Sequence, residues 1–211
     1  MIYTKKEIQE LDRVSRLKII NSVTGIKPAN LIGTIDAKGN TNLAVFSSVV
    51  HLGSHPALLG FVSRPRSKDA SHTYKNILEQ ESYTINHIHP EFVENAHYTS
   101  AKFSKEISEF NQCNLSEEYI DGFSAPFVKE STFKMGMRFK EAIDIKLNGT
   151  VLIVGEIEHL IIPDNALLAD HDIDLETSNS VGISGLNSYY ELKKIAKLPF
   201  AKVSQLPDFR I

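Results

Sequence analysis

The chain has 211 residues, of which 42% are hydrophobic and 23% are charged, with a formal net charge of −3. This composition fits a single globular domain over residues 1–211, and the acidic balance argues against a nucleic-acid partner or an anionic membrane surface. The only cysteine, Cys113, excludes an intramolecular disulfide and any CxxC motif. The charged N-terminus does not resemble a secretory signal, and no stretch is long and apolar enough to span a membrane, so we expect a cytoplasmic protein.

The first predicted element is a helix near the N-terminus. Thr4 and Glu7 have the spacing of a capping box, in which each residue satisfies a backbone N–H of the other. Apolar residues then recur at helical spacing from Ile8 to Leu17, and Gly25 ends the pattern.

A β-hairpin follows, with strands predicted over residues 30–36 and 41–47. The intervening DAKGN contains Gly39 and Asn40, which suit a tight turn with positive φ.

The middle of the chain alternates between strand and helix patterns. The apolar run at 55–63 predicts a buried strand, residues 73–81 predict a short helix, and residues 82–88 return to strand composition. Residues 89–127 are expected to form short helical or irregular pieces.

The last third again favours strands. Asn148-Gly149 is typical of a type I′ hairpin turn, and Gly155 is a candidate β-bulge in the returning strand. The segment 182–197 is expected to form a glycine-rich turn and a short helix. Because the strands come mainly as hairpins rather than as βαβ units, an antiparallel barrel is favoured over a doubly wound sheet.

Several catalytic signatures are missing from the sequence. GxSxG, GxxxxGK[ST] and GxGxxG do not occur, so a hydrolase elbow, a P-loop and a Rossmann fingerprint are not supported. His87 and His89 form an HxH pair, but a metal site needs further ligands, which His97 or the acids of residues 170–174 would supply only if the fold brought them close. We therefore expect no metal.

The basic loop after the strand at 55–63 is the strongest candidate site. Arg64 and Lys68 lie in it, and Thr73 is a plausible N-cap of the next helix, whose first amides would favour an anion. Ser47 and Ser48 would add hydroxyl donors if the strands at 41–47 and 57–63 are neighbours. The residues alone support equally well a phosphate or carboxylate site and a solvated loop that connects a strand to a helix.

Six segments in order resemble the flavin reductase-like group of FMN-binding split-barrel proteins, over about residues 16–190. They are NLAVFSSVV, HPALLGFVSRP, HTYKNI, SYTINHI, AHYTSAKFSKEISEF and GISGLNSYYEL. The resemblance implies a mainly β fold, a six-stranded antiparallel Greek-key split β-barrel with flanking α-helices. It also implies a homodimer with FMN near the subunit interface.

The same resemblance implies cofactor-binding residues. The FMN phosphate would be held by Ser47, Ser48, Arg64 and Thr73. Many relatives have a loop without the inserted Ala70-Ser71-His72, so Lys68 and His72 compete for one role. Three further residues match segments near the isoalloxazine ring or the phosphate: Asn86, His97 and Ser100.

The function that this resemblance implies is an FMN-dependent oxidoreductase of the flavin reductase type. NAD(P)H would be the electron donor, and because the flavin carries the redox chemistry, a catalytic side chain is not expected and none is assigned. Two alternatives stay open: an FMN-binding electron carrier without its own NAD(P)H site, and a split barrel that binds another phosphorylated ligand, such as a pyridoxal derivative.

Overall fold

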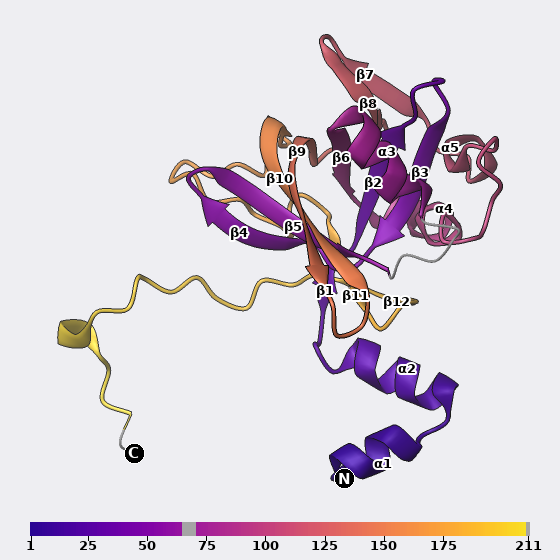
Figure 1. Cartoon of the computed structure of the whole chain (residues 1–211). Coiled ribbons are helices and arrows are strands. Elements are labelled where there is room, and N and C mark those ends of the chain that lie inside the picture. Colours follow the sequence, from indigo (N-terminus) through magenta and orange to yellow (C-terminus); the bar gives the residue numbers. More distant parts are fainter. Residues whose placement is uncertain (65–70, 210–211) are drawn as a thin grey trace.

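The computed structural model describes residues 1–64 and 71–209 (Figure 1). Twelve strands and seven helical segments are assigned in this part of the chain. The strands are β1 Lys27–Pro28, β2 Asn30–Ile35, β3 Thr41–Phe46, β4 Val50–Ser54, β5 Ala57–Ser63, β6 Ser82–His87, β7 Glu117–Ile120, β8 Phe123–Val128, β9 Lys134–Ile145, β10 Thr150–Ile161, β11 Val181–Ser184 and β12 Ser188–Glu191. The helices are α1 Lys5–Glu10, α2 Arg13–Ser22, α3 His72–Gln80, η1 Pro90–Phe92, α4 Val93–Tyr98, α5 Glu109–Gln112 and η2 Val203–Gln205.

The main sheet has seven strands in the order β3-β2-β6-β9-β10-β5-β4, and its neighbouring strands pair antiparallel. A small sheet, β1-β11-β12, and the hairpin β7-β8 flank it. The mainly β, antiparallel architecture confirms the predicted class, with seven strands in the main sheet where six were expected.

The β2–β3 hairpin forms as the DAKGN turn predicts. Asp36 Oδ1 accepts hydrogen bonds from the amides of Lys38 and Asn40, each at 2.9 Å, and Gly39 takes a φ of 86°. Burial alone would raise the pKa of Asp36, but the hydrogen bonds from Asn40 and the ammonium of Lys105 hold it below its usual range. The ionised carboxylate thus ties the turn together.

The predicted N-terminal helix is divided into two. The capping box of Thr4 and Glu7 is present, but α1 ends at Glu10. Asp12 then caps α2 by accepting hydrogen bonds from the amides of Val14 and Ser15 at 2.9 and 3.1 Å, which starts a new helix. Neither helix has a buried residue.

The long hairpin of β9 and β10 contains the predicted bulge. The pairing register shifts between Val154 and Gly155, and a Cβ at Gly155 would lie 2.2 Å from the hydroxyl of Tyr83. The predicted two-residue type I′ turn is wrong: four residues, 146–149, separate the strands, and only Gly149 has a positive φ. Asn148 instead accepts a hydrogen bond from the amide of Thr150.

Two segments differ from the sequence-based expectation. Residues 117–128 form the β7–β8 hairpin rather than helical or irregular structure. Residues 188–191 form β12, which pairs with β11, rather than a helix, and no helix is assigned to residues 192–197. In both segments the sheet partner overrides a local pattern that resembles a helix.

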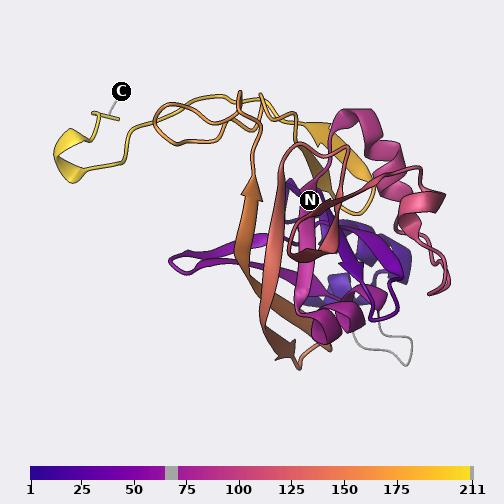
Figure 2. The same cartoon turned by 90° about the horizontal axis from the view of Figure 1, so that it is seen from above.

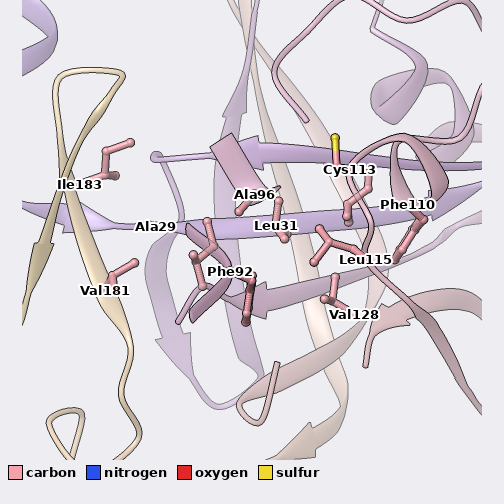
Figure 3. Close-up of a cluster of buried hydrophobic side chains, with 12 residues drawn as sticks. Ala29, Leu31, Phe92, Ala96, Phe110, Cys113, Leu115, Val128, Val181 and Ile183 are labelled. Carbon is pink, nitrogen blue, oxygen red and sulfur yellow. The ribbon is translucent and has the colours of Figure 1, made fainter. Parts of the chain in front are cut away.

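The core consists of two main clusters on opposite faces of β2 and β3. Leu31 and Leu43 belong to the cluster under α4 and α5 (Figure 3), which also includes half-buried Val45. Ile32 and half-buried Phe46 belong to the other cluster, which fills the barrel with side chains from β5, β6, β9 and β10. β3 therefore packs on both of its faces.

Both ends of the chain extend away from the barrel. The N-terminal helices lie on one side of it in Figure 1, and residues 192–209, which include η2, run outward in both views (Figures 1 and 2). Among the described residues, no helix combines the length and apolar character needed to cross a membrane.

Gly33 is expected to tolerate no side chain, because a Cβ there would lie 2.3 Å from the carbonyl oxygen of Pro126 and 2.6 Å from Thr84 Oγ1. Gly33→Ala should lower the free energy of unfolding, measured in urea, by about 2–3 kcal/mol through overpacking. Gly53→Ala is the control, since its Cβ would make an ordinary 3.5 Å contact. Equal stability of the two variants would contradict this account of β2.

Candidate functional site

The predicted site begins where β3 ends. Ser48 Oγ accepts a hydrogen bond from the amide of Val62 at 3.0 Å and lies 3.3 Å from the carbonyl of the same residue. The rings of Phe46 and Phe61 also meet edge to face, with centroids 4.9 Å apart. The end of β3 and the end of β5 are therefore close, although the two strands are not neighbours in the sheet.

Arg64 follows β5 directly and is exposed. Only Ser63 separates it from Val62, so its backbone lies near Ser48 and half-buried Ser47. Lys68, the other predicted cation, lies outside the described residues. Arg64, Ser47 and Ser48 thus lie near one another along the backbone, and a cation with two hydroxyls is a donor set that suits a phosphate or carboxylate.

The start of α3 lies elsewhere. Thr73 is not the N-cap: that position belongs to Ser71, whose side chain makes no capping hydrogen bond. Thr73 is instead inside the first turn and 2% exposed, and its hydroxyl accepts a hydrogen bond from Asn42 Nδ2 at 3.1 Å. His72, the first residue of the helix, is half-buried.

The two halves of the predicted anion site therefore mark opposite ends of one strand. Asn42, which contacts Thr73, is near the start of β3, and Ser47 follows its end. Five residues of extended chain span roughly 17 Å between their Cα atoms. A single phosphate cannot contact both Ser48 and Thr73, but an elongated ligand can reach both ends.

A buried polar network, which the sequence analysis missed, holds α3 against the β2–β3 hairpin. Thr34 Oγ1 accepts hydrogen bonds from Asn76 Nδ2 at 3.2 Å and from Asn42 Nδ2 at 3.4 Å. Asn76 Oδ1, in the described residues, is buried without a hydrogen-bond partner. Strand periodicity places Thr34 and Asn42 opposite each other, but nothing in the sequence relates them to a helix more than 30 residues away.

Glu109 is a second residue that sequence reasoning missed. It begins α5 in a buried position, and its Oε2 accepts a hydrogen bond from the amide of Leu43 at 2.9 Å. Burial raises the pKa of the carboxyl group, while the amide of Leu43 and the nearby His72 act in the opposite direction. Glu109 thus puts a carboxyl group close to the start of α3.

The side chain of Asn86 makes hydrogen bonds that hold neighbouring strands together. It is 0% exposed; Nδ2 donates to the carbonyl of Leu31 at 3.1 Å and to Thr84 Oγ1 at 2.9 Å, and Oδ1 accepts from the amide of Val128 at 3.0 Å. These bonds join β6 to β2 and β8. The side chain is enclosed by the protein, and its amide is occupied by these partners.

His97 lies on α4, which packs on the face of β3 opposite Phe46, and Ser100 follows this helix. Ala96, next to His97 on α4, belongs to the cluster that includes Val45. His97 Nδ1 is 3.2 Å from the hydroxyl of Tyr189 on β12, and burial raises the pKa of this tyrosine to about 12. Ser100 is exposed and donates its amide to the carbonyl of His97. The described residues therefore do not bring these two side chains to Ser48 or Arg64.

The HxH pair does not converge on one point. His87 Nδ1 lies 2.8 Å from Ser180 Oγ, and its ring stacks on Phe133 at 4.1 Å. His89 Nε2 accepts from the amide of Thr132 at 3.2 Å. Within residues 1–64 and 71–209, no group of three or more histidine, cysteine or acidic side chains is placed to hold a metal ion.

Two shallow polar hollows surround α5 rather than Ser48 and Arg64. Their volumes are about 500 and 320 Å³. Asn111 and Glu117 line both hollows. The larger hollow is also lined by Phe110, Asn114, Leu115 and Ser116. The smaller hollow is also lined by Gly39, Asn40, Thr41, Glu106, Ser108 and Tyr119. Glu117 already accepts hydrogen bonds from the hydroxyls of Thr41 and Tyr119, so these hollows do not mark the predicted anion site.

The comparisons with known proteins agree with the fold. Residues 26–177 match the family model described as flavin reductase like domain. A solved structure assigned as a flavin reductase with a split barrel domain, from Shewanella frigidimarina NCIMB 400, is 45% identical with a TM-score of 0.91, covering 95% of this chain and 100% of that chain.

Two more distant structures share the fold. Nitrilotriacetate monooxygenase component B from Bacillus cereus is 17% identical with a TM-score of 0.83, and 94% of this chain and 98% of that chain are covered. Flavoredoxin of Desulfovibrio vulgaris is 20% identical with a TM-score of 0.72, and 84% and 92% are covered.

His87 is expected to make stability depend on pH. Burial and the neighbouring His89 lower the pKa of His87 to about 4, from an ordinary value of 6.5. The unfolded chain therefore takes up the proton first, and the stability gained from neutral His87 is lost as the pH falls from 6.5 towards 4. The free energy of unfolding should drop by about 3 kcal/mol over this window through His87 alone.

Urea unfolding at several pH values measures this slope. His87→Asn should flatten it relative to the unmodified chain, whereas His51→Asn, at an exposed position on β4, should not. Parallel slopes in all three proteins would exclude His87 as the cause.

Proposed function

The chain belongs to the flavin reductase like domain family, and on this basis we propose that it binds FMN and passes electrons from NAD(P)H through the flavin to an acceptor. The observation that carries the proposal is the family match over residues 26–177, a range that includes every predicted cofactor-binding residue. We further propose that the chain works in the cytoplasm as a homodimer, without a nucleic-acid or membrane partner.

The donor set near the end of β3 supports a phosphate-bearing ligand. Exposed Arg64 would pair with the phosphate, and the hydroxyls of Ser47 and Ser48 would donate further hydrogen bonds. Ser48 can contribute only in part, because its hydroxyl also contacts the backbone of Val62. Arg64 therefore has the largest role that we propose for a described residue.

The distance between the two halves of the site supports an elongated ligand. His72 and Thr73 lie at the other end of β3, so they would contact a part of FMN other than the one at Ser47. Thr73 accepts one hydrogen bond from Asn42 and still carries a proton that it can donate. A small phosphorylated ligand, such as a pyridoxal derivative, is less suited to both ends.

Bound FMN would supply the hydride and electron transfer through its isoalloxazine ring. The residues of this chain would bind and orient the cofactor and limit access of water. This division of labour fits the absence of catalytic motifs from the sequence, and we assign no catalytic residue. Lys68, Asn86, His97 and Ser100 stay predictions, with Asn86 the least suited because its amide is enclosed.

The visible spectrum of the purified protein with FMN, recorded anaerobically before and after NADH and then NADPH, tests the function. A flavin spectrum that bleaches with either nicotinamide supports a flavin reductase. A bound flavin that bleaches with neither identifies the electron carrier without its own NAD(P)H site. A protein that shows no flavin spectrum at saturating FMN would overturn the proposal.

Arg64→Ala should weaken FMN binding by roughly 10- to 100-fold, because one charge-assisted contact with the phosphate would be lost. Flavin fluorescence titration measures the dissociation constant. Lys129→Ala, which removes an exposed cation after β8, is the matched control and should leave the affinity unchanged. If the two variants bind FMN equally well, Arg64 is not part of the site.

A further inference from the structure

The C-terminal arm, residues 192–209, presents apolar side chains to solvent. It leaves the barrel after β12 and runs away from it in both views (Figures 1 and 2). The exposed fractions are 98% for Ile195, 82% for Leu198, 88% for Phe200, 88% for Val203, 64% for Leu206 and 79% for Phe209. An apolar segment that is this exposed in a single copy of the chain indicates an interaction site, in which a partner surface covers the apolar side chains.

Ion pairs hold the root of the arm in place. Lys194 Nζ lies 3.7 Å from Asp174, and its amide donates to Glu176 at 2.9 Å. Lys197 pairs with Asp170 and, at 2.6 Å, with Asp172. Each exposed pair contributes little alone, but together they fix where the arm departs and in which direction.

A matching apolar surface lies on the outside of the main sheet. Phe61 on β5 points into the barrel core, so Gly60 and Val62 face outward. A Cβ at Gly60 would lie 2.9 Å from Leu52 Cδ1 and 3.1 Å from Leu152 Cδ1, which places both leucines on this outer face.

The strand register extends this surface across four strands. Ile143 on β9 is opposite Leu152, Leu152 is opposite Val62, and Val50 on β4 is opposite Gly60. Val50 is 48% exposed, and Leu52 and Ile143 are each 43% exposed. We call this surface the outer sheet face, defined by Val50, Leu52, Val62, Ile143 and Leu152.

We infer that the C-terminal arm is an exchanged dimerisation arm, which packs across the outer sheet face of a second copy of this chain. Each copy carries one arm and one such face, so a two-fold pair covers both surfaces reciprocally and closes without leaving either exposed. The anchored root directs the arm away from its own barrel, which favours the second copy over the arm's own sheet.

The areas are consistent with a stable pair. Phe200 and Phe209 alone would bury roughly 300 Å², and each copy would add four further apolar arm side chains and its outer sheet face. A specific interface needs roughly 800 Å² per partner. The inference rests on the homodimer proposed above and not on flavin, so it is tested in flavin-free protein.

Light scattering over a dilution series tests the arm. Phe200→Asp combined with Leu206→Asp should raise the dimer dissociation constant on the order of 100-fold, since charge on the two apolar positions would oppose burial. Ala201→Asp combined with Gln205→Asp adds the same charge to the same segment and is the control. If the Phe200→Asp, Leu206→Asp variant dimerises as well as this control, the arm does not form the dimer contact and the inference is overturned. This conclusion holds even though the unmodified chain would then still be a dimer.

Mixing two variants tests whether the contact is between copies. The face variant, Leu52→Asp with Ile143→Asp, should also be monomeric. In an equal mixture with the arm variant, Phe200→Asp with Leu206→Asp, the face variant supplies an intact arm and the arm variant supplies an intact outer sheet face. The mixture should therefore dimerise at a concentration at which each variant alone is monomeric. A mixture that stays monomeric would overturn the exchange, and a monomeric unmodified chain would overturn the homodimer too. The proposed flavin binding is tested separately, by the visible spectrum of the protein with FMN.

Discussion

The closure of the barrel between β3 and β5 is the constraint on which the site depends. The two strands are not paired, and the side chain of Ser48, with the ring contact between Phe46 and Phe61, joins them instead. A side-chain closure brings the ends of the strands together without a continuous ladder of backbone hydrogen bonds. Ser47 and Ser48 thereby lie near the backbone of Arg64, where we propose that a phosphate binds, and β3 packs on both of its faces.

The sequence predicted well what local chemistry decides. The DAKGN turn is determined by Asp36 and Gly39, the bulge at Gly155 by the absence of a Cβ, and the N-terminal capping box by residues three positions apart. The family resemblance then supplied the barrel class, because several short segments in order carry more information than any one motif.

Tertiary partners decided the rest, and no local pattern could predict them. Thr73 fits an N-cap by residue type, yet Asn42, 31 residues away, holds it inside the helix. Asn86 is a polar residue on a strand and resembles a ligand contact. Its side-chain amide is instead hydrogen-bonded to the carbonyl of Leu31 and to the backbone amide of Val128. The local pattern around the two tyrosines of β12 favours a helix, whereas their pairing with β11 depends on the fold of the whole chain.

The buried amide of Asn86 also protects the sheet against misalignment. β6 lies between β2 and β9, so an error in its alignment would propagate to both sides. Slippage of β6 by one residue would turn Asn86 to the opposite face, and leave the amide of Val128 and the carbonyl of Leu31 without this partner in a dry interior. A residue that first resembles a ligand contact thus disfavours a one-residue slip of β6, a strand that is buried on both faces.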